Sequence, residues 1–439
     1  MNTSARFANS IVAAAFFTGC AGSQPPIGAP GAMQPSPVVV PQGDRGTSWM
    51  PAAAMANNPS VRRTVEPAFR IVYSFRGGRE GFAPRASLLA FKGTLYGTAA
   101  GNSDVSGTVF SLTTAGAYRV LHHFTGGRDG AYPVASLIAA GGVLYGTTYF
   151  GGGIDGGTVF RINTAGQESV LHGFGSAGDG LYPEASLIAE NGLLYGTTYW
   201  GGSFRCIDVG CGTVFSVDSK TGQESLLYKF QGTPTPNHTR DGAYPLSNVI
   251  KVNDVFYGTT LYGGKHGKGT IFEVSPETGK ERVAYSFAGR ADGAYPWAGV
   301  IDLGGMLYGT TGGASAQKGG TVYRFDPQNG TVQTLHSFSG GSDGLYPQSS
   351  LVAVKGTLYG TTVGGGGYKR CLNSHVRVYC GVVFSVTPGG VETVLHRFGA
   401  TRGDGKTPVA SLIYFKGALY GTTTAGGTHG RGTIFALTP

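Results

Sequence analysis

Residues 143–148, Val-Leu-Tyr-Gly-Thr-Thr, and residues 157–160, Gly-Thr-Val-Phe, form the centre of a unit that the chain repeats seven times. The tripeptide Tyr-Gly-Thr begins at Tyr96, Tyr145, Tyr195, Tyr257, Tyr308, Tyr359 and Tyr420. The successive spacings are 49, 50, 62, 51, 51 and 61 residues. A period near 50 that is built of short strands is typical of a β-propeller blade.

Each unit contains four predicted strands, which we term a, b, c and d. In the second unit they span residues 135–139, 143–148, 158–162 and 168–174. Apolar residues occupy successive positions instead of alternating with polar ones. This pattern predicts strands that are packed on both faces, as between neighbouring blades.

The two ends of the repeat region complement each other. Residues 69–75, Phe-Arg-Ile-Val-Tyr-Ser-Phe, match strand d alone, and residues 432–438 match strand c, after which the repeat stops. We therefore expect the amino-terminal strand to complete the last blade, which leaves no free sheet edge there. The predicted fold class is all-β, a closed seven-bladed propeller.

The composition agrees with this fold. The chain has 439 residues, of which 77 are glycine, 11% are aromatic and 13% are charged. Such a chain needs many turns but has ample apolar surface to bury. The net charge of +9 is spread along the chain without a basic stripe or a known reader motif, so we predict no nucleic-acid partner.

Residues 1–19 resemble a secretion signal, with Arg6 before a short apolar run, Ile11 to Phe17. Phe17-Thr-Gly-Cys20 resembles a bacterial lipobox, which predicts lipidation of Cys20; an ordinary signal peptide is the alternative. Residues 20–67, rich in Pro, Ala and Gly, have no apolar period and are expected to form a disordered tether. Residues 68–439 are predicted to form the propeller. The protein is expected to be exported and either anchored at the cell surface or secreted.

The combination of Leu-Tyr-Gly-Thr-Thr, Gly-Thr-Val-Phe and a final Asp-Gly resembles the GloVer-type tandem repeats of bacterial extracellular proteins. The resemblance extends from Phe69 to Pro439 and recurs seven times. It implies export and a propeller-like fold. It implies no catalytic residues.

The four cysteines after Cys20 form two local pairs in the two longest b–c loops. They are Cys206 with Cys211, and Cys371 with Cys380. In an exported chain we expect two disulfides that fix these enlarged loops. A shared zinc ion is disfavoured because the pairs lie three blades apart.

An acidic residue followed by glycine precedes each strand a: Glu80, Asp129, Asp179, Asp241, Asp292, Asp343 and Asp404. A cation site is conceivable, but seven copies favour a turn that satisfies its own backbone. Strand d places His or Tyr two residues before its phenylalanine, and this exchange favours a structural role. The sequence predicts neither metal nor cofactor.

The d–a and b–c loops are expected to share one face of the disc, and aromatic residues are concentrated there in some blades. These candidate ligand-binding residues are Tyr132, Tyr182, Tyr244, Tyr295, Tyr346, Phe150, Trp200, Tyr262 and Trp297. We expect them to form a stacking platform for a glycan or an extended peptide. The alternative is that the Tyr-Pro pairs buttress the loops.

No catalytic motif is present in the sequence. The expected function is a monomeric, non-catalytic binding or scaffold module for an envelope polysaccharide or protein, which meets the membrane through its lipid anchor alone. The alternative is a carbohydrate-active enzyme, a lyase or a glycosidase, for which Asp155 and Asp208 are the acids to inspect.

Overall fold

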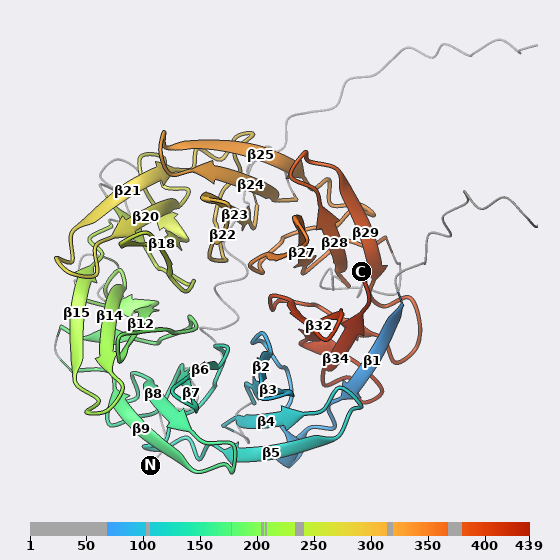
Figure 1. Cartoon of the computed structure of the whole chain (residues 1–439), viewed down its shortest axis with the longest axis horizontal. Helices are drawn as coiled ribbons and strands as arrows, with labels where there is room; N and C mark the ends of the chain where they lie inside the picture. Colours follow the sequence, from blue (N-terminus) through green and yellow to red (C-terminus); the bar gives the residue numbers. More distant parts are fainter. Residues whose placement is uncertain are drawn as a thin grey trace, which may run out of the picture. The chain divides into compact units, whose positions relative to one another are not determined.

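The computed structural model describes residues 68–101, 106–176, 178–202, 206, 209–232, 241–313, 319–367 and 380–439. These residues form seven four-stranded antiparallel sheets arranged in a ring (Figure 1). In each sheet strand a is innermost and strand d outermost, so the predicted seven-bladed propeller is confirmed.

The strands follow the repeat closely. Blade 1 contains β2 (Leu89–Phe91), β3 (Thr94–Ala99), β4 (Thr108–Leu112) and β5 (Tyr118–His123). Blade 2 contains β6 (Ile138–Ala140), β7 (Val143–Thr148), β8 (Thr158–Ile162) and β9 (Glu168–Gly173). Blade 3 contains β11 (Ile188–Glu190), β12 (Leu193–Thr198), β14 (Thr213–Asp218) and β15 (Glu224–Lys229). Blade 4 contains β17 (Ile250–Val252), β18 (Val255–Thr260), β20 (Thr270–Val274) and β21 (Glu281–Ser286).

The remaining blades have the same form. Blade 5 contains β22 (Ile301–Leu303), β23 (Met306–Thr311), β24 (Thr321–Asp326) and β25 (Thr331–Ser337). Blade 6 contains β26 (Val352–Val354), β27 (Thr357–Thr362), β28 (Val382–Val386) and β29 (Glu392–Arg397). Blade 7 contains β31 (Ile413–Phe415), β32 (Ala418–Thr423), β34 (Thr433–Leu437) and β1 (Phe69–Ser74).

Blade 7 closes the ring as predicted. β1 pairs antiparallel with β34, with Phe69 opposite Leu437 and Ser74 opposite Thr433. The first and last strands of the propeller therefore lie side by side in one sheet (Figure 1). β1 thus pairs with the edge of β34 that would otherwise be open.

The two repeated motifs of the sequence pack against each other inside each blade. The glycine of Tyr-Gly-Thr lies under the phenylalanine of Gly-Thr-Val-Phe: a Cβ at Gly146 would stand 2.6 Å from the ring of Phe160. The glycine of Gly-Thr-Val-Phe packs against the next blade, since a Cβ at Gly157 would stand 2.6 Å from Pro183. Both glycines are required by these close contacts.

The first threonine of each Tyr-Gly-Thr motif hydrogen-bonds to the next blade. Its hydroxyl donates to a backbone carbonyl just before strand a, as from Thr98 to Ala135 (3.1 Å) and from Thr259 to Ala298 (3.0 Å). The equivalent bond from Thr422 to Ala86 (3.2 Å) joins blade 7 to blade 1. A bond of this kind contributes about 1 kcal/mol.

Strand a begins later than the sequence predicted. In blade 2 we expected residues 135–139, whereas β6 spans Ile138–Ala140. The reason is that residues 135 and 136 bond sideways to other blades instead of to strand b. The carbonyl of Ala135 accepts the Thr98 hydroxyl, and the amide of Ser136 donates to the Ser186 hydroxyl (3.1 Å).

Short two-stranded ladders join the d–a loop to the b–c loop of the same blade. They are β10 (Gly180–Leu181) with β13 (Trp200–Gly201), β16 (Gly242–Ala243) with β19 (Tyr262–Gly263), and β30 (Gly405–Lys406) with β33 (Ala425–Gly426). Single bridges replace the ladder elsewhere, as between Ala131 and Phe150. The ladders hold the two loops of a blade at fixed positions relative to each other.

One short 3-10 helix, η1 (Gly78–Glu80), lies in the first d–a loop. Within the described segments, no helix has the length and apolar character needed to cross a membrane. Cys206 and Cys211 form the predicted disulfide, with their Cα atoms 5.1 Å apart. Cys380 is also disulfide-bonded, while Cys371, its predicted partner, lies outside the described residues, as do residues 1–67 with Cys20.

Candidate ligand-binding site

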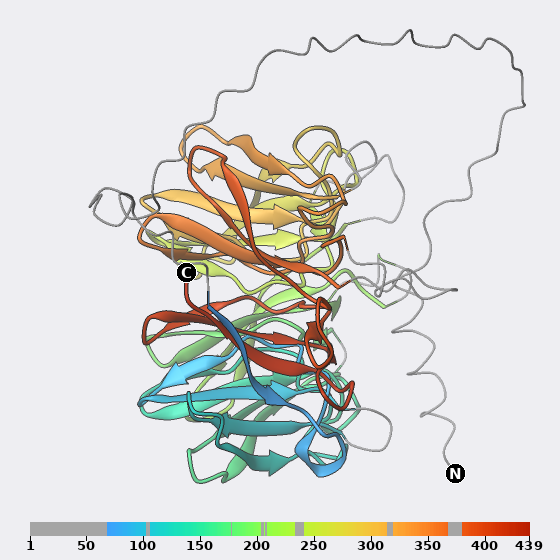
Figure 2. The same ribbon diagram turned by 90° about the vertical axis from the view of Figure 1, so that its right-hand side faces the viewer.

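The two faces of the disc differ. Seen edge-on, short hairpin turns lie at one face, and the irregular d–a and b–c loops lie at the other (Figure 2). The a–b turns are tight, as at Asn191 and Gly192, which both have positive φ. We call the face formed by the d–a and b–c loops the loop face.

The residue before the repeated proline adopts a strained backbone conformation in all seven blades. Its φ lies between 51° and 59° whether it is tyrosine, as at Tyr182, alanine (Ala83) or threonine (Thr407). Its backbone amide donates to the preceding blade each time, for example from Tyr182 to Gly156 (2.8 Å) and from Ala83 to Arg431 (3.0 Å). Because alanine and threonine make the same anchor, the fold does not require the tyrosine ring.

The structure brings seven of the nine predicted aromatic residues into one continuous arc over blades 2 to 5. Neighbouring rings contact edge-to-face or stacked, with centroids 4.6 to 5.9 Å apart. Tyr149 and Tyr199, which the sequence analysis missed, bridge adjacent members, the first stacking on Tyr182 and the second contacting Tyr244. The aromatic arc comprises Tyr132, Phe150, Tyr149, Tyr182, Trp200, Tyr199, Tyr244, Tyr262 and Tyr295.

Small residues replace the arc in other blades. Where blades 2, 3 and 4 have Phe150, Trp200 and Tyr262, blades 1, 5, 6 and 7 have Gly101, Gly313, Gly364 and Ala425. The loop face is therefore asymmetric, although the repeat that supports it is regular. Of the other two predicted residues, Trp297 packs over Gly312 at the central channel and Tyr346 lies beside Gly313.

The central channel contains a cavity of about 120 Å³. The residue after each repeated proline lines it, and this residue differs between most blades: Arg85, Val134, Glu184, Leu246, Trp297, Gln348 and Val409. Small polar residues form a second ring, in which the Ser87 amide donates to the Ser136 hydroxyl (2.9 Å). Of the residues that follow the prolines, the sequence analysis identified Trp297 alone; variation directly after an invariant proline was the signal that could have revealed the others.

In the described part of the chain, Glu184 and Arg85 are the two ionisable residues that line the channel cavity. Burial raises the pKa of Glu184, and the positive charge of Arg85 opposes this shift. Burial also raises the pKa of Tyr149 and Tyr199, and the nearby Glu184 charge raises both further. The arc and the channel wall are therefore electrostatically coupled through Glu184.

The acidic turn residues bond within their own turns, which supports the structural interpretation. Asp292 accepts the backbone amides of Ala288 (2.6 Å) and Arg290 (3.0 Å), and Asp404 accepts those of Gly399 (2.9 Å) and Gly405 (2.7 Å). The His or Tyr of strand d faces this acid, as Tyr285 donates to Asp292 (3.1 Å). The two repeated features of the sequence thus form one cluster.

Asp155, one of the two acids considered for catalysis, lies in a loop and accepts the amide of Gly151 (2.8 Å). The other, Asp208, lies outside the described residues. Among the described residues that line the channel cavity, Glu184 is the one carboxylic acid.

The fold and this site define a class: a closed seven-bladed β-propeller whose loop face bears an aromatic arc beside the central channel. Within that class, the chain belongs to the Gloeobacter/Verrucomicrobia repeat family, whose model matches residues 60–239 and 208–435. The resemblance found in the sequence is thereby confirmed. No curated protein matches the chain.

Several solved structures are similar to this chain at low sequence identity. A protein described as the extracellular domain of a one-component system of B. thetaiotaomicron is 9% identical, with a TM-score of 0.51. The match covers 84% of this chain and 39% of that chain. An oligogalacturonate lyase in complex with manganese is 12% identical, with a TM-score of 0.48, over 79% of this chain and 86% of that one. A structure of a nidogen/laminin complex is 14% identical, with a TM-score of 0.39, and the match covers 58% of this chain and 80% of that chain.

Proposed function

We propose that this chain is an exported, non-catalytic binding protein that holds a polysaccharide of the cell envelope on its loop face. The observation that supports this most is the continuity of the aromatic arc from Tyr132 to Tyr295 across four blades. Sugar rings stack on flat aromatic faces, and a row of such faces suits an extended chain of sugars.

The arc combines apolar faces with polar groups. Tyr262 is 43% exposed, and the ammonium of Lys268 bonds the Tyr295 hydroxyl (2.8 Å) at the end of the arc. Glu184 and Arg85 offer a hydrogen-bond acceptor and a donor at the channel. A hydroxyl-rich ligand could therefore stack on the rings and bond at their rims.

The test is binding of the purified chain to immobilised envelope polysaccharides, with Tyr262→Ala and Trp200→Ala as the arc variants. Tyr414→Ala is the matched control, because Tyr414 is 42% exposed but lies on β31, outside the arc. We expect the arc variants to lose at least tenfold in affinity and the control to bind like the wild type. Equal binding by all three variants would refute the arc as the site, and binding to a protein instead would replace the polysaccharide as ligand.

Export is part of this proposal. The disulfide between Cys206 and Cys211 fits an oxidising compartment. Lipidation at Cys20 follows from the lipobox-like Phe17-Thr-Gly-Cys20. Labelling of expressing cells with a fatty-acid probe should mark the wild type and leave Cys20→Ser unlabelled; equal labelling would refute the anchor.

A second candidate, a carbohydrate-active enzyme, is favoured by one feature. Burial raises the pKa of Glu184 inside the channel cavity, as expected of a general acid. Glycosidases need a second carboxyl group at a defined distance. Release of sugar products by the wild type, abolished in Glu184→Gln, would favour this candidate over the binding protein.

A further inference from the structure

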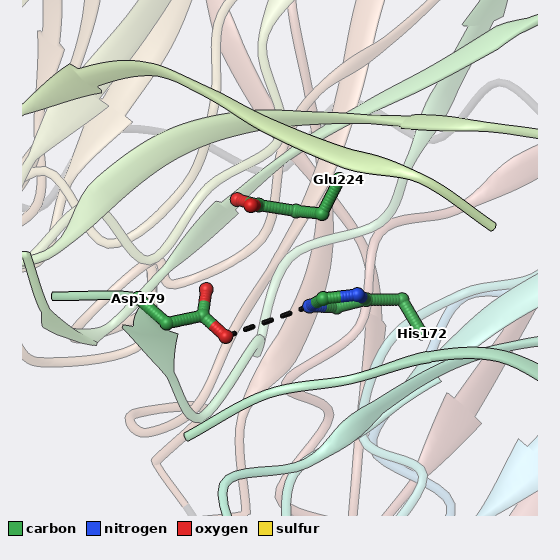
Figure 3. A group of neighbouring side chains, drawn as sticks. All are labelled: His172, Asp179 and Glu224. Carbon is green, nitrogen blue, oxygen red and sulfur yellow. Dashed lines mark ion pairs between the residues drawn. The ribbon is translucent and has the colours of Figure 1, made fainter. Parts of the chain in front are cut away.

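A three-residue cluster of metal-binding types lies at the outer junction of blades 2 and 3, away from the channel. His172 lies on strand β9, Asp179 is the acid of the following turn, and Glu224 begins strand β15 of the next blade. Figure 3 shows the imidazole of His172 directed toward the carboxylate of Asp179, with the carboxylate of Glu224 nearby. One nitrogen and two carboxylate oxygens, each from a different element, thus face a common point.

The distances fit an ion better than direct hydrogen bonds. The three candidate ligand atoms lie within 4.8 Å of one another, and Nε2 of His172 stands 3.5 Å from Oδ2 of Asp179. This separation exceeds that of a normal N–H···O bond. Two ligands, each about 2.0–2.2 Å from a tetrahedral ion, stand roughly 3.4 Å apart.

Two of the three candidate ligand atoms have no hydrogen bond to any part of the chain that the structure describes. They are Nε2 of His172 and Oε1 of Glu224, and both atoms are buried. Asp179, only 9% exposed, is oriented by the backbone amides of Gly175 (3.2 Å) and Gly180 (2.6 Å). Buried polar atoms are nearly always paired, so these two need an explanation.

Other blade junctions form a natural series of variants. Where Phe69 takes the place of Glu224, it stacks on His396, and Nε2 of His396 bonds Asp404 at 3.3 Å. Where Tyr228 takes the place of His172, its hydroxyl donates to Asp241 at 2.8 Å. Where histidine and glutamate occur together, Nε2 of the histidine therefore has no hydrogen bond and keeps only a longer ion pair with the acid of its turn, at 3.5 to 3.7 Å.

We propose that His172, Asp179 and Glu224 bind a first-row divalent cation such as Zn²⁺ and thereby tie the outer strands of blades 2 and 3 together. The sequence predicted no metal because the acidic residue recurs in all seven units, whereas the site depends on His172 and Glu224, which meet across one blade junction. One imidazole and two carboxylates suit zinc, while calcium disfavours imidazole.

The same residue types occur at two other junctions, as His122, Asp129 and Glu168, and as His336, Asp343 and Glu392. Their histidine Nε2 and glutamate Oε1 atoms also lack a hydrogen bond among the described residues. The junction of blades 2 and 3 is the one among the described residues at which all three ligand atoms come within 4.8 Å. We therefore place the site at this junction. The test compares the number of zinc ions bound by the wild type with the number bound by variants of this junction.

Binding should strengthen as the pH rises, because the ion binds carboxylates and a neutral imidazole and therefore competes with protons for these ligands.

The test is calorimetric titration of the full chain, purified without a histidine tag and freed of metal, with ZnCl₂ and, in parallel, CaCl₂. Glu224→Val copies Val332, which holds the equivalent position at another junction, and His172→Tyr copies Tyr285. Glu281→Val at the junction of Tyr228 is the matched control. Thermal melting of each variant, without metal, verifies that it is folded.

We expect Glu224→Val and His172→Tyr each to bind one zinc ion fewer than the wild type, and Glu281→Val to bind the same number. Zinc should raise the melting temperature of the wild type more than that of either site variant. Calcium should give no heat at this site. Equal zinc stoichiometry in the wild type and Glu224→Val, or no zinc binding by the wild type, would overturn the proposal.

Discussion

The hydroxyl of Thr422 in blade 7 donates a 3.2 Å hydrogen bond to the carbonyl of Ala86, which precedes the innermost strand of blade 1. Thr422 is 1% exposed and Ala86 is 3% exposed, so the bond is buried. Together with the pairing of β1 and β34, this bond joins the two ends of the repeat array.

Thr422→Val should therefore destabilise the propeller by about 1–3 kcal/mol, because the isosteric side chain leaves the buried Ala86 carbonyl unpaired. Urea unfolding measures the loss. Thr393→Val, on the exposed surface of β29, serves as the control and should stay within about 0.5 kcal/mol of the wild type. Equal stability of the two variants would mean that the closing bond contributes nothing.

A second prediction concerns the contact between the two repeated motifs. Gly146→Ala should destabilise blade 2 by about 1–3 kcal/mol, since the new Cβ would meet Phe160 at 2.6 Å and Leu137 at 2.8 Å. Gly153→Ala is the control, because a Cβ there meets nothing within 4 Å.

The smaller side chain of Phe160→Leu should restore part of the stability of Gly146→Ala. Denaturant midpoints of the single and double variants give this coupling. If the double variant loses the sum of the two single losses, the clash is not the cause.

Most of the fold could be predicted from the sequence because each blade repeats the same contacts. Gly146 packs on Phe160, which is the contact between strands b and c, and Gly157 packs on Pro183, which is a contact between adjacent blades. The repeated motifs therefore consist of the residues that make these contacts. The start of strand a was mispredicted because Ala135 and Ser136 form hydrogen bonds with other blades. The pattern of apolar residues does not show with which strand a backbone group pairs.

The site was predicted less completely. The arc members at repeated positions, such as Tyr182 and Trp200, were found because an aromatic residue stands there in some blades and a small residue in the others. Tyr149, Tyr199 and Glu184 were missed, since their importance depends on which side chains meet at the channel. Likewise, Glu224 lies near His172 because neighbouring blades pack side by side in the ring, and the spacing of the two residues in the sequence does not predict this contact.

The third prediction is a fall in stability as the pH rises from about 4.5 to 7. Burial, and then the Asp241 charge, raise the pKa of Glu281 from 4.5 to about 7. The folded protein therefore binds more protons than the unfolded chain in this window, and stability decreases with pH. Melting temperatures measured in EDTA should decline more steeply for the wild type than for Glu281→Gln, and parallel curves would contradict the prediction.

The fourth prediction concerns the disulfide between Cys206 and Cys211. The two cysteines are only five positions apart in the sequence, so loss of the disulfide in Cys206→Ala/Cys211→Ala should cost about 2 kcal/mol. The amide of Gly201, next to Trp200, donates to Val209 within this loop (2.8 Å). Polysaccharide binding should weaken too, and unchanged binding in the folded variant would show that the loop does not position Trp200.

The last prediction separates ligand binding from loop buttressing at Tyr182. Its amide bond to Gly156 and its positive φ are matched at Ala83, so Tyr182→Ala keeps the backbone anchor. We expect a stability loss of about 1 kcal/mol, from the ring contacts with Tyr149 and Trp200, and at least a tenfold loss of polysaccharide affinity. Urea unfolding and a binding isotherm on the same preparation give both quantities. A loss of about 3 kcal/mol or more with unchanged affinity would assign the ring to the architecture, because that is the cost of removing a buried aromatic side chain from a core.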